Sequence, residues 1–176
     1  WVHVPEALAF YRTGDHSLSQ DVERVLSDAA VVIHRGFASD PRLPNADPAH
    51  AAGASRAHGV TPELVLAYFT LWYSAFDAAR GHDPLRTQTM FHALPADGEH
   101  ANDVAATLLH GVMVGLRVVP SQLAARWDDF GPRITALIDT LGALWNDTVA
   151  ARRTQYAFER LLLQHNELAT PRRLAL

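Results

Sequence analysis

The most apolar and aromatic stretch of the chain runs from Thr61 to Gly81. Thr61 suits the capping position before a helix, Pro62 suits the first helical position, and Gly81 suits the residue that follows the last turn. Between these ends, apolar side chains cover nearly every direction around a helix, which is typical of a helix buried among others. The pattern therefore predicts a central helix over residues 62–80 in an all-α domain.

The rest of the chain repeats its apolar residues at spacings of three and four, and no segment alternates as a strand does. These spacings predict further helices over residues 5–11, 17–36, 48–58, 84–94, 98–118, 120–130 and 132–168. We expect a break at Gly131-Pro132, because proline clashes inside a helix, and an interruption or a new cap at Asn146-Asp147. The prediction is a single-domain bundle of six to eight helices over residues 1–176, with a loop at 39–48 and a frayed tail at 170–176.

In the predicted helix over residues 17–36, the apolar residues lie on one side. Such a stripe faces the core of a soluble protein, while the opposite side faces water. We therefore expect the following set to point inward: Leu18, Val22, Val25, Leu26, Ala29, Val32 and Ile33.

Composition excludes several classes of protein. The formal charge of −4 over 176 residues argues against a nucleic-acid binder, which usually carries a basic face. The absence of cysteine excludes disulfides, thiolate catalysis and cysteine-ligated metals. No run approaches the roughly 18 apolar residues of a membrane span. All 15 basic residues are arginine, which fits a bacterial-like, GC-rich coding bias. We expect a cytoplasmic protein that binds neither nucleic acid nor membrane.

Two lines of polar residues are the only features that suggest a site. On the helix over 62–80, Thr70, Ser74 and Asp77 follow one another at spacings of four and three. On the helix over 98–118, a similar line is formed by His100, Asp103, Thr107 and His110. Residues at these spacings share one face of a helix.

If the two lines face each other, they form a polar strip inside an apolar bundle, as in many small-molecule pockets. The predicted ligand pocket consists of Tyr68, Thr70, Trp72, Ser74, Phe76, Thr107, His110 and Met113. Acid–base chemistry there would use His110 with Asp77 or Asp103. The alternative is that both lines are simply the solvent-facing sides of their helices.

The ten histidines do not form a recognisable metal-binding pattern, because most lie singly in separate segments. His82-Asp83 is similar to the His-Asp pair of metal phosphohydrolases, but Asp83 is explained as a helix cap before Pro84. The aromatic residues of the helix over 62–80 fit a core better than a haem site. We therefore predict no metal and no cofactor, with a histidine-ligated metal or haem as a third alternative.

Two further features suggest association. Gly111 and Gly115 are four residues apart, so a neighbouring helix can approach closely there, in the same chain or in a dimer. The last helix carries a broad apolar surface that fits either its own core or a partner. The sequence thus favours a non-enzymatic regulatory or assembly domain that binds a partner protein, itself as a homodimer, or a small apolar ligand. The alternative is an enzyme with a histidine-based site between the helices over 62–80 and 98–118.

Overall fold

The computed structural model describes residues 21–42, 51–54, 59–84, 91, 93–95 and 100–169. These residues contain helices and no strand, which confirms the all-α class. The helices are α1 (Val22–Gly36), α2 (Pro62–Ala79), α3 (Ala101–Leu116), α4 (Trp127–Trp145) and α5 (Thr148–Ala169), with short 3₁₀ helices η4 (Pro120–Gln122) and η5 (Ala124–Arg126).

The predicted number of six to eight helices is not confirmed, since five α-helices lie in the described part of the chain. The predicted helix over 5–11 lies outside the described residues, and the one over 84–94 lies mostly outside them. In the predicted helix over 48–58, the four described residues, 51–54, form turns and bends.

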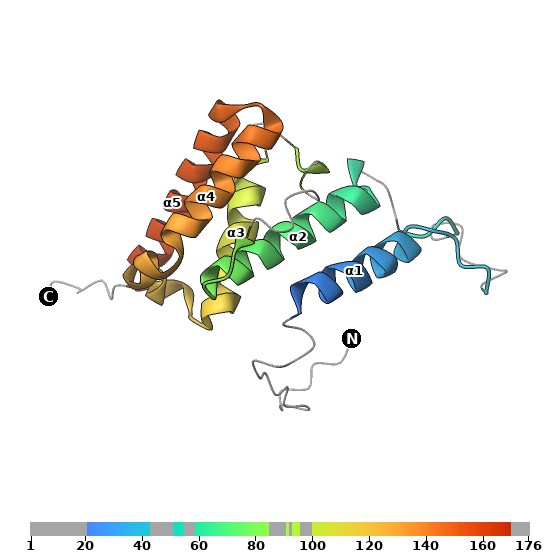
Figure 1. The fold of residues 1–176 in the computed structure, drawn as a ribbon, viewed down its shortest axis with the longest axis horizontal. Helices are drawn as coiled ribbons and strands as arrows, with labels where there is room; N and C mark the ends of the chain where they lie inside the picture. The colour runs from blue at the N-terminus through green and yellow to red at the C-terminus, as the bar shows by residue number, and fades with distance from the viewer. Residues whose placement is uncertain are drawn as a thin grey trace, which may run out of the picture.

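The helices pack as a bundle in which α2 contacts α1, α3 and α4 (Figure 1). Helices α4 and α5 run antiparallel beside each other, and α3 packs against both α2 and α5. Helix α1 lies antiparallel to α2, which is its main neighbour (Figure 1). The two halves of the chain therefore meet where α2 contacts α3 and α4.

The predicted ends of α2 are confirmed. The Thr61 hydroxyl accepts a hydrogen bond from the backbone N–H of Leu64 at 3.1 Å, as an N-cap does. Gly81 has a φ of +89°, in the region where glycine is favoured over residues with a side chain. The local sequence is thus sufficient to place this helix.

The junction between α4 and α5 is a new cap rather than a simple interruption. Asn146 adopts a left-handed conformation with a φ of 51°, which ends α4. The Asp147 carboxylate then accepts hydrogen bonds from the backbone N–H groups of Val149 at 2.8 Å and Ala150 at 3.0 Å, which begins α5. Two residues therefore reverse the chain direction.

The expected break at Gly131-Pro132 is wrong, because α4 continues through Pro132. A Cβ atom on Gly131 would lie 2.3 Å from the Trp127 ring, so the indole rests directly on the glycine backbone. The Arg133 guanidinium donates to the carbonyl of Asp129 and to that of Ala78 in α2, at 3.1 Å for the latter. These contacts hold the first turns of α4 together around the proline.

The predicted helix over 120–130 is also wrong in detail. Its first part forms η4 and η5, and only residues 127–130 are α-helical, as the start of α4. Short 3₁₀ turns of this kind are common before an α-helix.

The inward stripe predicted for α1 is correct only near its start. Val22 and Leu26 are buried, but the Val32 side chain is 68% exposed and neighbouring Val31 is 50% exposed. Helix α1 has α2 as its main neighbour, and one neighbouring helix covers a narrower face than a bundle does. The prediction that Val32 points inward is therefore wrong, and Leu18 lies outside the described residues.

The core is continuous across α2, α3, α4 and α5, and its largest fully buried side chains include Phe91, Phe130 and Phe158. The backbones of α2 and α3 approach closely where the two helices cross. A Cβ atom on Gly111 would lie 2.4 Å from the carbonyl oxygen of Trp72, and one on Gly115 would lie 2.6 Å from that of Phe76. The glycine pair of α3 therefore contacts α2 of the same chain.

We expect Gly111→Ala to reduce the free energy of unfolding by about 1–3 kcal/mol, because the added methyl group must separate two packed backbones. The matched control is Gly36→Ala in α1, where nothing lies within 4 Å of the added atom. There the same substitution should stabilise by about 0.4–1 kcal/mol, because it only restricts the unfolded chain. Urea unfolding followed by circular dichroism measures both. Stabilisation by Gly111→Ala would contradict the close crossing.

Candidate functional site

The polar line of α2 is buried. Thr70 is 0% exposed, and Ser74 and Asp77 are each 2% exposed. The Thr70 hydroxyl donates to the carbonyl of Leu66 at 2.8 Å, and the Ser74 hydroxyl donates to that of Thr70 at 2.9 Å. The two hydroxyl protons are therefore used within α2, as is common for Ser and Thr inside helices.

Asp77 lies where α2 ends, and its partner there is His82. The Asp77 Oδ1 atom is 3.2 Å from the His82 Nδ1 atom, with the Asp77 side chain buried and the His82 side chain 53% exposed. The backbone N–H of His82 also donates to the Asp77 carbonyl at 3.0 Å. Arg133 of α4 donates to the next carbonyl, that of Ala78. Basic groups favour this end of a helix, where the dipole is negative.

These groups border a shallow hollow of about 350 Å³ between the end of α2 and α4, lined by Gly81, His82, Asp83, Pro84, Arg133 and Ala136. The contacts of Asp77 and Arg133 tie the last carbonyls of α2 to their surroundings. We interpret this cluster as the C-terminal anchor of α2.

The polar line of α3 has a different environment. Asp103 and His110 are exposed, while His100 and Thr107 are half-buried. The Thr107 hydroxyl donates to the carbonyl of Asp103 at 2.7 Å. Within the described part of the chain, no hydrogen bond or ion pair joins the buried polar line of α2 to Asp103, Thr107 or His110.

His110 instead contacts Trp72. The indole N–H of Trp72 donates to Nδ1 of His110 at 2.9 Å, and the two rings lie 5.9 Å apart. An indole N–H can only donate, so Nδ1 of His110 is the acceptor in this contact. The structure thus pairs His110 with an aromatic residue of α2, and joins it to neither Asp77 nor Asp103.

The remaining residues of the predicted pocket lie around this contact and in the core. Trp72 is half-buried and stacks on Phe76, with ring centres 5.7 Å apart and an interplanar angle of 15°. Tyr68 and Met113 pack against the hydrophobic core. None of the predicted pocket residues lines the three hollows whose walls are described residues. A ligand pocket between α2 and α3 stays a prediction.

Helix α5 carries the clearest exposed apolar feature. Val149, Tyr156 and Leu163 are 54%, 69% and 59% exposed. They are seven residues apart, so they form one line along the helix, which we call the α5 stripe. The sequence shows this spacing but not which side of α5 faces the core. The side of α5 opposite the stripe faces the core and carries the buried residues Ala150, Thr154, Ala157 and Phe158.

A groove of about 390 Å³ runs beside the α5 stripe, between α4 and α5. Gly142 permits close packing at its floor, since a Cβ atom there would lie 2.7 Å from that of Ala151. Asp139 on the α4 wall and Arg152 on the α5 wall are both exposed. Neither forms an ion pair with another described residue. The groove is lined by Thr135, Ile138, Asp139, Gly142, Ala143, Thr148, Ala151, Arg152 and Gln155.

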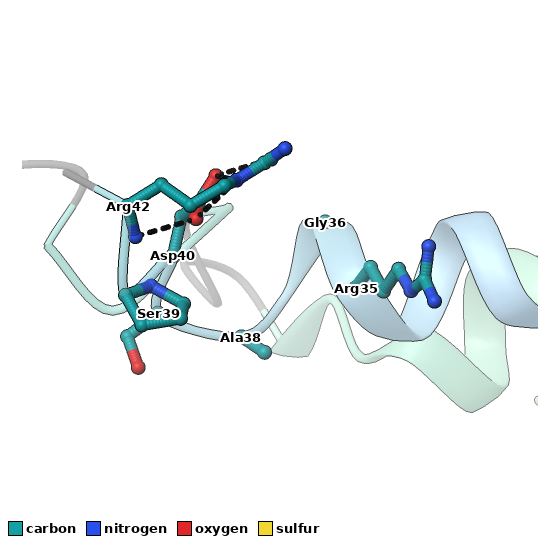
Figure 2. Close-up of a pocket in the computed structure, with 7 residues that line it drawn as sticks. Arg35, Gly36, Ala38, Ser39, Asp40 and Arg42 are labelled. Atoms are coloured by element: carbon teal, nitrogen blue, oxygen red, sulfur yellow. Dashed lines mark hydrogen bonds and ion pairs between the residues drawn. The ribbon is translucent and has the colours of Figure 1, made fainter.

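A third hollow, of about 450 Å³, lies at the end of α1 (Figure 2). Two of its charged groups are paired with each other, because Nη2 of Arg42 donates to Oδ2 of Asp40 at 2.6 Å and Nε donates to Oδ1 at 2.9 Å. The backbone N–H of Arg42 adds a bond to Oδ1 at 3.0 Å. These bonds lower the pKa of the Asp40 carboxyl to about 2. Figure 2 shows this pair at the edge of the hollow, with Arg35 on the helix.

Within the described residues, no group of three or more His, Cys, Asp or Glu side chains is placed to hold a metal ion. In the same part of the chain, no helix combines the length and the apolar character needed to cross a membrane. The chain matches no known protein-family model, no curated protein and no solved structure.

We expect Asp77→Ala to reduce the free energy of unfolding by about 1–3 kcal/mol, because it removes a buried, hydrogen-bonded carboxylate. Asp103→Ala is the matched control on α3. Its carboxylate is exposed, so we expect a loss below about 1 kcal/mol, mostly from the helix dipole. Equal losses, measured by urea unfolding, would show that the two polar lines do not differ in environment.

We also expect carboxyl-carbon NMR to show Asp40 titrating with a pKa of about 2, and Arg42→Ala to return it toward 3.8. The pKa is lowered in the folded chain, so the pair stabilises the turn at residues 40–42 at pH values above the ordinary pKa of 3.8. This contribution is lost as the pH falls through about 2. An unchanged pKa in Arg42→Ala would exclude arginine as the cause.

Proposed function

We propose that this chain is a non-enzymatic helical assembly domain that binds another protein through the exposed face of α5. The observation that carries the proposal is the α5 stripe. Three large apolar side chains, each more than half exposed, lie in one line on a helix whose opposite side is already packed. Exposed apolar side chains aligned on one face mark an interaction surface more often than single apolar residues do.

The spacing of the α5 stripe fits a helical partner. A repeat of seven residues keeps the three apolar side chains on one side of α5, where a single partner helix can contact all of them. Arg152, Arg153, Glu159 and Arg160 are exposed on α5 and flank the stripe. Burial of a large apolar side chain contributes about 1.5–3 kcal/mol. Three such side chains can therefore stabilise a specific complex, with the charges setting its orientation.

A small apolar ligand between α2 and α3 is the second candidate. It is favoured by the burial of Thr70, Ser74 and Asp77 beside the aromatic residues of α2. The enzymatic alternative lacks such support, because the only hydrogen-bond partner of His110 among the described residues is Trp72.

Site-specific photocrosslinking tests the proposed surface. We expect a photoreactive phenylalanine analogue in place of Tyr156 or Leu163 to form a discrete crosslinked product in the cells that produce the protein. Mass spectrometry then identifies the crosslinked chain. We expect the crosslink because a partner bound along the α5 stripe lies within contact distance of both positions.

The control position is Arg24, whose side chain is 58% exposed on α1. The same analogue there should give no such product, since α1 lies on another part of the bundle (Figure 1). If Tyr156 and Leu163 give no discrete product, or only the products seen at Arg24, the proposed function is wrong.

A further inference from the structure

We propose that the partner of this domain is a second copy of the same chain, docked at the groove between α4 and α5. This inference rests on the proposed function and names the partner. It is carried by the charges on the walls of the groove and by the position of the α5 stripe next to them.

The groove presents one unpaired charge of each sign. Asp139 lies on the α4 wall and Arg152 lies on the α5 wall, and both line the same hollow. They are exposed, and neither is paired with another described residue. A partner that places a basic group over Asp139 and an acidic group over Arg152 therefore complements the charges of the groove.

A second copy meets both requirements with the same two residues. A two-fold axis that lies in the interface and runs along the groove, between Asp139 on one wall and Arg152 on the other, places the partner's arginine over one aspartate. The same operation places the partner's aspartate over the other arginine. Such an interface is self-complementary, and two-fold dimers of this kind are the commonest protein oligomers. An unrelated partner would need a separate match for each charge.

The shape of the surface also suits a packed helix. Gly142, Ala143 and Ala151 give the groove small side chains, so a helix of the partner can approach both α4 and α5. Arg152 is three residues after Val149 and four residues before Tyr156, so it lies next to the α5 stripe. The two opposite charges and the exposed apolar residues thus form one surface.

Charge reversal tests this interface. We expect sedimentation velocity of the purified chain to show a monomer–dimer equilibrium. Asp139→Arg places two arginines opposite each other, and Arg152→Asp places two aspartates opposite each other. Each single substitution should raise the dissociation constant of the dimer about tenfold or more, because like charges replace opposite ones. The double substitution exchanges the two charges and should restore most of the affinity.

The control is Arg35→Asp, the same reversal at an exposed arginine of α1, which should leave the dissociation constant unchanged. Circular dichroism verifies that each variant keeps its helical content. A dimer that is insensitive to both single reversals, or a double variant no tighter than the single ones, would place the interface elsewhere and overturn the inference.

The two proposals fail in different ways. If the wild-type chain is monomeric at all concentrations while crosslinks from Tyr156 lead to a different protein, the second copy is excluded and the proposed function stands. If the chain is monomeric and Tyr156 and Leu163 give no discrete crosslink, both are wrong. A crosslink from Tyr156 to a second copy, together with the charge-reversal pattern, supports both.

Discussion

The bundle depends on the direct contact between the backbones of α2 and α3. Two hydrogen atoms, on Gly111 and Gly115, lie where any side chain would meet the carbonyl oxygens of Trp72 and Phe76. This closeness places Trp72 within reach of His110 and brings the second half of α2 into the core. Close packing of this kind leaves little room for adjustment, because protein interiors are as dense as molecular crystals. The rest of the core is arranged around the crossing.

The buried polar groups of α2 follow from the same packing. A helix held this closely places one line of polar side chains where water cannot reach it, so each polar group needs a partner in the protein. Thr70 and Ser74 use carbonyls of their own helix, and Asp77 uses His82 just beyond the last turn. Arg133 then connects the end of α2 to α4. The C-terminal half of α2 is thus held both by the crossing with α3 and by the contacts at its end.

Local signals in the sequence were sufficient for the all-α class and for several helix ends. Thr61, Gly81 and Asn146-Asp147 act through their own backbone neighbours, so their roles can be inferred without the fold. Pro132 was misjudged because its tolerance depends on Gly131 lying under Trp127 and on Arg133 reaching α2. Those contacts are formed only in three dimensions.

The candidate sites show the same limit. Helical spacing correctly groups Thr70, Ser74 and Asp77 on one face, but it does not say which neighbour covers that face. The same uncertainty applies to Val32 in α1, where a regular apolar stripe continues past the part that α2 buries. The two opposite charges of Asp139 and Arg152 on one groove could not be recognised, because the two residues belong to different helices and share a groove only after the chain reverses at Asn146-Asp147.

That reversal has a consequence for local unfolding. Helices α4 and α5 are joined by two residues, so their mutual contacts close short loops and cost little chain entropy. Helix α5 also packs against α3, so this part of the bundle is held independently of α1, which is attached mainly to α2. Both walls of the groove belong to this part. Partial unfolding that detaches α1 therefore leaves the groove between α4 and α5 in place.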